Sequence, residues 1–312
     1  MIQYLDTAAP RTILQQEHPL FPKRLLEIPK PPEFLHALGS IDTLLSPSLA
    51  IVGARKATPY GLSCAKHFAR LAALCGITVI SGGAVGCDQA AHKGALEVGG
   101  RTVVVLGCGA DVVYPVKGEK LFYQVLEEEG TIISEAPWGS PPTKWGFKKR
   151  NRIIAGMAQA TLIVEAGLPS GTFSTADATL EQGKEVLAVP GSIFAKESKG
   201  ANLLIAQGAI PIVDDQTFTD ALIQLFGIIN RVSLFEEAQA DTGIPKENNT
   251  TRAAEGANHK VIHALTQEPL RPESLLGICG DNVVEVIRYL SSLELAGIVE
   301  RLRDGRYAVV SH

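Results

Sequence analysis

The chain contains, at residues 49–61, the stretch LAIVGARKATPYG. Its apolar start, Leu49–Gly53, predicts a β-strand, and the turn at Gly53 leads into a helix-compatible segment from Tyr60 to Cys75. A strand that is apolar at nearly every position suits a sheet that is covered on both faces. We therefore expect this stretch to be one βα unit of a parallel sheet.

The alternation of strand and helix continues to about residue 229. Further apolar runs predict strands at Thr78–Ser81, Thr102–Leu106, Thr131–Ser134, Thr161–Val164, Glu185–Val189 and Ile210–Val213. Helix-compatible segments between them include Asp88–Val98 and Ser174–Gln182. This pattern predicts an α/β fold, a Rossmann-like parallel sheet with helices on both faces. A mixed α+β domain is the alternative.

Composition suggests four parts in the chain. Residues 1–48 are rich in proline and predict a lead-in that holds at most short helices, such as Glu33 to Leu38. The Rossmann-like domain is expected at residues 49–230 and a polar linker at 231–257. From 258 to 312, three short helical patterns precede a hairpin with the tight turn Asp304-Gly305, which predicts a small winged-helix domain.

Bulk composition excludes several classes of protein. The 312 residues are 46% hydrophobic and 20% charged, with a net charge of −4, so the chain is globular and a nucleic-acid site would have to be a local basic patch. Five scattered cysteines without a C-x-x-C pair predict reduced thiols in a cytoplasmic protein, with no zinc site. We expect no secretory signal, membrane span, metal or cofactor.

Ligands of an open parallel sheet bind outside the carboxyl ends of its strands. The segments that follow the predicted strands are small and glycine-rich: Gly53–Lys56, Ser81–Gly86, Gly107–Gly109, Ser134–Pro137, Glu165–Thr172 and Pro190–Ser192. Glycine lets backbone N–H groups approach an anion, so this edge suits phosphate. Purely structural turns are the alternative.

The segment Lys144–Arg152 contains five basic residues and no acidic one, and Trp138 and Trp145 lie beside or within it. Aromatic rings among cations are typical of single-stranded nucleic-acid sites, where bases stack and phosphates pair with charge. The alternative is a solvated basic loop with its aromatic residues packed inward. The predicted DNA-binding residues are Gly53, Arg55, Lys56, Ser81, Gly82, Trp145, Phe147, Lys148, Lys149, Arg150, Asn151, Arg152, Ser170, Gly171 and Thr172.

Other polar residues favour structural roles. Asp88 and His92 have the i, i+4 spacing of an acid–base dyad or a metal-binding pair, but a third ligand is missing and Asp88 suits the first turn of a helix. Glu135, Glu165 and Glu181 are isolated. We predict no catalytic residue and no enzyme activity.

An ordered set of motifs between about residues 20 and 215 resembles the DNA-processing protein A family (DprA/Smf). The set comprises Ile51–Thr58 with Tyr60-Gly61, Ser81-Gly82 with Gly86 and Asp88–His92, Gly107–Gly109 with Tyr114-Pro115, Ser134-Glu135, Arg150–Gly156, Val164–Ala166, Ser170–Thr172 with Thr175-Ala176, and Val189–Gly191. The C-terminal pattern is similar to the winged-helix domain that often ends these proteins.

This resemblance implies a Rossmann-like homodimer that binds single-stranded DNA. It also implies that the protein protects incoming DNA during natural transformation and loads the RecA recombinase. The family's DNA-contacting arginine falls on Arg55, and its F-x-x-R-N-R loop falls on residues 147–152. Lys148 stands where many relatives have proline, which adds charge to this loop.

Two other functions compete with this interpretation. A phosphoribohydrolase-like nucleotide-processing enzyme would need a P-G-G-x-G-T-x-x-E pattern, and after Pro169–Thr172 no glutamate follows at that spacing. A transcription factor would read duplex DNA through the winged helix. The presumed recognition helix is net acidic, with Asp281, Glu285, Arg288 and Glu294, which favours an accessory or protein-binding role.

Phe218, Leu222, Leu225 and Phe226 recur at helical spacing. This apolar stripe either joins two copies of the chain or packs on its own sheet, and the sequence does not decide between the two.

Overall fold

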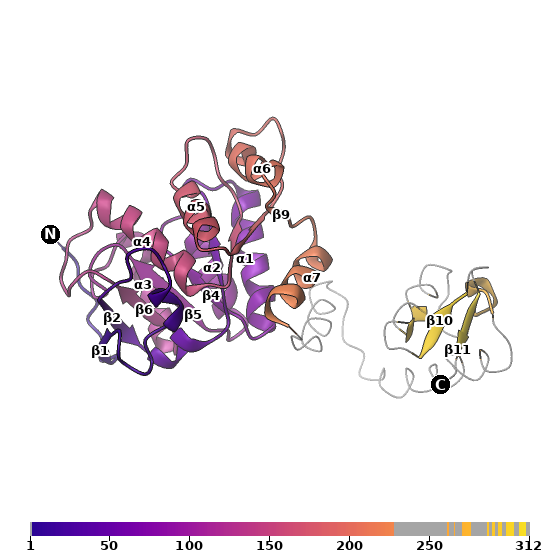
Figure 1. Ribbon diagram of the computed structural model, residues 1–312, viewed down its shortest axis with the longest axis horizontal. Coiled ribbons are helices and arrows are strands. Elements are labelled where there is room, and N and C mark those ends of the chain that lie inside the picture. Colours follow the sequence, from indigo (N-terminus) through magenta and orange to yellow (C-terminus); the bar gives the residue numbers. More distant parts are fainter. Residues whose placement is uncertain are drawn as a thin grey trace. The chain divides into compact units, whose positions relative to one another are not determined.

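The computed structural model describes residues 2–227 and, beyond them, 261, 265, 270–275, 286, 289–290, 293–294, 298–302 and 306–309. The chain forms two compact units, Met1–Asp241 and Thr242–His312 (Figure 1).

The first unit is built on a nine-stranded sheet with the order β1-β2-β6-β5-β4-β3-β7-β8-β9. From β6 to β9 all neighbours are parallel, whereas β2 pairs antiparallel with β6 and β1 antiparallel with β2. The strands are β1 Arg11–Gln15, β2 Phe34–Gly39, β3 Ser48–Val52, β4 Thr78–Ser81, β5 Thr102–Leu106, β6 Thr131–Ser134, β7 Ala160–Ile163, β8 Glu185–Ala188 and β9 Ile210–Pro211.

Helices cover both faces of the sheet, as the continuous apolar strands predict. One face carries α1 Pro59–Leu74, α2 Cys87–Leu96, α3 Glu119–Glu127 and α7 Asp215–Phe226. The other carries α4 Lys144–Met157, α5 Phe173–Glu181 and α6 Lys199–Ala206. In β5, Val103 and Val105 pack toward α4 while Val104 and Leu106 pack toward α3, so alternate residues serve the two layers. The 3₁₀ turns are η1 Lys23–Leu26, η2 Ile41–Leu45, η3 Val116–Gly118 and η4 Lys196–Ser198.

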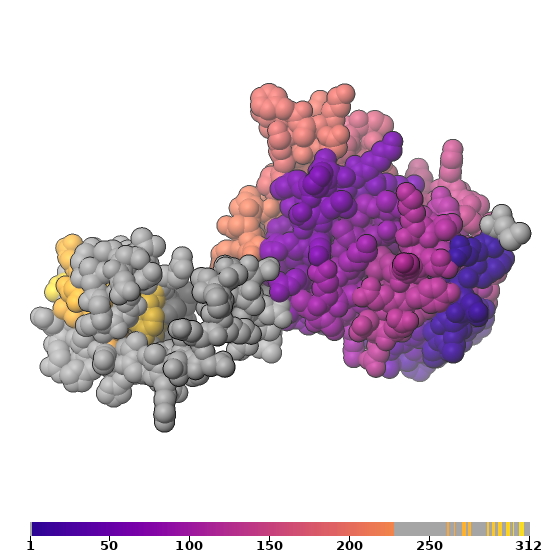
Figure 2. Space-filling model, turned by 180° about the vertical axis from the view of Figure 1, so that it is seen from behind, coloured from indigo at the N-terminus to yellow at the C-terminus, as the bar shows by residue number. Residues whose placement is uncertain are grey.

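The prediction of at most short helices before residue 49 is wrong. The segment Phe34–Gly39 is strand β2, and its register with β6 pairs Ala37 with Ile133 and Leu38 with Ile132. Leu35 and Leu38 are fully buried, each in one of two hydrophobic clusters of the sheet domain. In the space-filling view the indigo N-terminal residues lie directly against the magenta surface of the sheet domain (Figure 2). The first 48 residues are therefore part of the sheet and its core.

The apolar stripe of residues 218–226 packs on its own sheet. An Asp214–Thr217 capping box starts α7, and Phe218 and Leu222 are both 0% exposed within the core around α1. The Phe218 ring lies 4.8 Å from that of Phe68 on α1. Phe218 and Leu222, two of the four residues of the stripe, are therefore not available to join two copies of the chain.

In the second unit, β10 (Val299–Arg301) pairs antiparallel with β11 (Tyr307–Val309), as the hairpin pattern predicts. Pro272–Leu275 is a 3₁₀ turn, η5. Among its described residues, Val261, Leu265, Leu275, Val286, Leu290, Leu293, Val299 and Tyr307 form a buried apolar cluster. The turn Asp304-Gly305 and the acidic-helix residues Asp281, Glu285 and Arg288 lie outside the described residues, so the winged helix stays a prediction.

The fold places one histidine in a fully buried position on α2. His92 is 0% exposed, and its Nδ1 lies 2.7 Å from the hydroxyl of Thr102. That hydroxyl donates to the Val79 carbonyl, so Nδ1–H of His92 is the donor to Thr102. Nε2 has no hydrogen-bond partner among the described residues. Burial lowers the pKa of His92 from 6.5 to about 3.

Because of His92, we expect the protein to become less stable in mild acid. Between pH 6.5 and 3 the unfolded chain binds a proton at His92 that the folded chain does not, so the free energy of unfolding decreases as the pH falls. The loss amounts to about 2 kcal/mol from pH 7 to pH 5. Chemical denaturation at both pH values measures it. His92→Asn keeps a donor for Thr102 but does not titrate, so its pH dependence is flatter. Parallel pH profiles for the two proteins would contradict this assignment.

Candidate nucleic-acid interface

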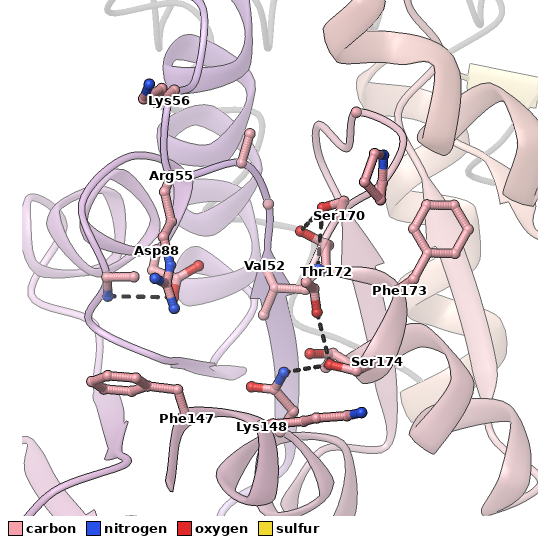
Figure 3. A pocket seen from close by; sticks show the side chains of 18 of the residues that line it. Val52, Arg55, Lys56, Asp88, Phe147, Lys148, Ser170, Thr172, Phe173 and Ser174 are labelled. Carbon is pink, nitrogen blue, oxygen red and sulfur yellow. Dashed lines mark hydrogen bonds between the residues drawn. The ribbon is translucent and has the colours of Figure 1, made fainter. Parts of the chain in front are cut away.

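A cleft of ≈ 910 Å³ opens at the carboxyl ends of β3 and β7, the edge where the sequence predicts a ligand. Its walls are the β3–α1 loop, the first turns of α4, and the β7–α5 loop with the start of α5. In Figure 3, Arg55 and Asp88 lie on one side, Ser170 and Thr172 on the other, and Phe147 and Lys148 below them. Segments more than 100 residues apart in the chain thus share one site.

The β3–α1 loop carries two exposed cations, Arg55 and Lys56, into the cleft wall. A buried carboxylate anchors the loop: Glu165 accepts hydrogen bonds from the backbone N–H of Thr58 (2.9 Å) and from its hydroxyl (2.7 Å). Thr58 in turn caps α1 by accepting from the N–H of Gly61. Gly53 packs against Cys87, whose Sγ would be 2.6 Å from any Cβ at residue 53. Glu165 therefore holds the loop in place.

The basic segment is a helix, where the sequence interpretation had a loop. Thr143 accepts from the N–H of Gly146 and caps α4, and the helix buries Ile153 and Ile154 against the sheet. Helical periodicity then sorts the side chains by face. Lys144, Phe147, Lys148 and Asn151 line the cleft.

The other face of α4 carries the remaining predicted residues away from the cleft. Trp145 is 69% exposed, and Lys149 Nζ lies 5.0 Å from the centroid of its ring. Lys149 and Arg152 both pair with Glu135, at 3.1 and 2.7 Å. Trp145, Lys149 and Glu135 line a separate cavity of ≈ 210 Å³. The structure does not bring Trp145, Lys149 or Arg152 into the cleft.

Arg150, one of the predicted DNA-binding residues, lines the cleft but is buried. It is 6% exposed, and its guanidinium donates to the carbonyls of Gly82 (2.7 Å) and Val105. A Cβ at residue 82 would collide with that guanidinium, which explains the glycine. Asp88, also buried, attracts the charge. Arg150 thus ties α4 to the ends of β4 and β5 beneath the cleft.

Ser81 and Gly82 likewise lie beneath the site. Both are buried, and the Ser81 hydroxyl donates to the carbonyl of Ile51 at 2.6 Å. Neither residue lines the cleft. Ser81 fixes the end of β4 against β3, and the Gly82 carbonyl accepts a hydrogen bond from Arg150. Sequence spacing alone does not reveal these contacts.

One contact joins the two basic segments directly. The Arg55 guanidinium carbon lies 5.5 Å from the centroid of the Phe147 ring, within the range of a cation–π interaction. The Tyr114 ring stacks on the same phenylalanine, with centroids 5.1 Å apart. Arg55 therefore faces the same cleft as α4, which is the arrangement that the sequence interpretation requires.

The β7–α5 loop supplies hydroxyl and backbone groups at the opposite wall. The Ser170 hydroxyl accepts from the N–H of Thr172 at 3.1 Å and donates to the Thr172 hydroxyl at 3.0 Å. Asn151 on α4 donates to the Ser174 hydroxyl at 2.6 Å and so joins the two walls. Ser170, Gly171 and Thr172 all line the cleft at the N-terminus of α5, where a helix favours anions.

The charge of the cleft wall is positive. Its exposed cations are Arg55, Lys56, Lys144, Lys148 and Lys196, against the carboxylates of Asp177 and Glu197 and the buried Asp88. The sequence interpretation did not select Lys144 or Lys196. Lys144 stands one helical turn before Lys148, and Lys196 follows the glycine-rich turn after β8, so helical periodicity and strand order could have found them.

Asp88 and His92 do not form a dyad. Asp88 lines the floor of the cleft, where burial raises its pKa and Arg150 opposes that shift, while His92 is bonded to Thr102. Thr175, three residues after Thr172, is buried where the rival enzyme pattern needs a glutamate. Among the described residues, no group of His, Cys, Asp and Glu could hold a metal ion, and no helix is long and apolar enough to span a membrane.

Arg150 is buried and Arg55 is exposed, so we expect substitution by glutamine to affect the stability of the protein differently at the two positions. Arg150→Gln removes the buried charge that attracts Asp88 and the guanidinium that donates to two carbonyls, so the free energy of unfolding decreases by about 3 kcal/mol. Arg55→Gln changes an exposed side chain and leaves it within about 0.5 kcal/mol. Chemical denaturation of both variants measures the two values. Equal stability of the two variants would contradict the structural role of Arg150.

Residues 12–223 match the model of a family described as DNA recombination-mediator protein A. Protein Smf of Escherichia coli is 33% identical over 94% of this chain and 76% of its own length, and Protein Smf of Synechocystis 31% over 94% and 79%.

Two solved structures are similar over the sheet domain. DprA from Streptococcus pneumoniae has a TM-score of 0.63 and 33% identity, over 69% of this chain and 74% of that chain. DprA from Helicobacter pylori, solved to describe its single-stranded DNA binding mode, has a TM-score of 0.63 and 30% identity, over 70% of this chain and 97% of that one. With the family model matched over most of the sheet domain, this chain belongs to the DNA recombination-mediator protein A (DprA/Smf) family.

Proposed function

We propose that the chain binds single-stranded DNA in the cleft between α4 and the β3–α1 and β7–α5 loops. The observation that carries the proposal is the convergence of exposed cations from three separate segments on one cleft: Arg55 and Lys56, Lys144 and Lys148, and Lys196. A flexible polyanion needs such a local concentration of positive charge on a chain whose net charge is −4.

The chemistry of the cleft favours a single strand. Phe147 offers an aromatic side chain among the cations, and hydroxyl and backbone groups of residues 170–172 face it at a helix N-terminus. The related Helicobacter pylori protein is described as binding single-stranded DNA. In this proposal Arg55 and Lys148 contact phosphates, while Arg150 supports α4 from below.

Charge reversal tests the proposal. Arg55→Glu and Lys148→Glu are each expected to weaken binding of a labelled oligothymidylate by about tenfold or more at moderate salt. Each should also lower the slope of log affinity against log salt by about 0.7, because a phosphate contact is lost. Fluorescence anisotropy at several salt concentrations measures both quantities.

Arg101→Glu is the matched control. Arg101 is exposed but precedes β5, at the opposite edge of the sheet, so its reversal changes net charge equally without touching the cleft. An equal loss of affinity in all three variants would mean that total charge governs binding. Unchanged affinity in the two cleft variants would remove the proposal.

The proposal extends to the loading of RecA onto the bound strand, and so to the protection of incoming DNA during natural transformation. The description of the matched family as a recombination mediator supports it. We expect the chain to speed RecA filament assembly on DNA that is covered with single-strand-binding protein. Assembly is followed by RecA ATP hydrolysis, and the Arg55→Glu variant should lose the acceleration. Equal rates with and without the chain would contradict this part.

We propose further that the protein acts in the cytoplasm as a homodimer. The two copies would meet through a surface that does not include the buried residues Phe218 and Leu222. We also propose that residues 258–312 form a winged helix with an accessory role. The antiparallel pair β10–β11 and its buried apolar cluster support the last point. In this proposal the chain binds DNA and carries out no catalytic step on it.

A further inference from the structure

The edge of the cleft nearest to β5 ends in a column of three side chains. Phe147 is the middle member: Arg55 lies over its ring, and Tyr114 stacks on it with planes inclined by 25°. Phe147 is half-buried, whereas Tyr114 is 39% exposed. The accessible aromatic surface of the column therefore belongs in large part to Tyr114.

The order of strands explains how Tyr114 reaches this position. Tyr114 lies in the loop after β5, Val85 in the loop after β4, and Arg55 in the loop after β3, and these three strands are adjacent in the sheet. Val85 is 40% exposed, and Val116, two residues after Tyr114, is 60% exposed. These exposed side chains, Val85, Tyr114 and Val116, make up an apolar rim in the loops after β4 and β5.

A cation beside an accessible ring is the arrangement that one nucleotide of a single strand requires. The guanidinium pairs with its phosphate, and a ring face receives the base. Tyrosine suits the rim of such a site because one part of it is apolar and its hydroxyl remains in water. The rim is continuous with the cleft through direct contact between Tyr114 and Phe147.

We propose that Tyr114 is a base-binding residue, which stacks on the base of a nucleotide just outside the cleft, next to the phosphate held by Arg55. This inference rests on the proposed function, since it gives the bound strand its path beyond the cleft. The strand then runs along the carboxyl edge of the sheet from the β7–α5 loop toward β5.

Abasic scanning tests the assignment. The affinity of the full chain for a short oligothymidylate is measured by anisotropy, with one abasic site moved along the strand. In the wild-type protein each base that stacks produces a loss of affinity at its position, of about tenfold. In Tyr114→Ala one of these losses should disappear while the others remain. Tyr114→Phe, which keeps the ring, should restore it.

The outcomes separate this inference from a packing role and from the proposed function. If Tyr114→Ala lowers affinity equally for intact and abasic strands, the residue only supports Phe147 and the inference is wrong. If all abasic losses persist in Tyr114→Ala, the base lies elsewhere and the inference is also wrong. If Arg55→Glu binds as tightly as the wild type, it is the proposed function that fails. A change in oligomeric state of Tyr114→Ala, seen by light scattering, would assign the rim to a second copy instead.

Discussion

The buried guanidinium of Arg150 is the contact on which the cleft depends. It reaches from α4 to the carbonyls of Gly82 and Val105, at the ends of two neighbouring strands, and Asp88 on α2 balances its charge. A helix, two strands and a second helix are therefore held at one point. Because an unpaired charge at this depth is costly, the four elements keep one relative position, and with them the cleft wall.

A second constraint is the helical repeat of α4. Five basic residues occur within nine positions, yet their side chains divide between two faces. Lys144 and Lys148 reach the cleft, while Lys149 and Arg152 both pair with Glu135 on the far face. The number of basic residues in this segment is therefore larger than the number of positive charges that line the cleft. The cleft becomes basic only because other loops add Arg55, Lys56 and Lys196.

Among the aromatic residues, too, those that are close in the sequence are not the ones that are close in space. Trp145 is only two residues from Phe147 but lies on the other face of the helix. Tyr114, more than thirty residues before Phe147, stacks on it. The surface that the bound strand would meet is therefore assembled by the sheet edge, in the order of the strands, and not by the order of residues in any one segment.

The amino-acid pattern predicted the parallel core of the fold and the edge at which the cleft opens. Apolar runs such as Thr102–Leu106 coincide with strands because burial on both faces leaves few polar positions, and the glycine-rich turns after them must meet at one edge. The folded chain alone shows which residues face the cleft and which strands close the sheet. Phe34–Gly39 becomes a strand through pairing with β6, and Arg150 is buried by acceptors 45 and 68 residues away. Long-range hydrogen bonds of this kind leave no periodic trace in the local sequence, since their partners are set by the packing of distant segments.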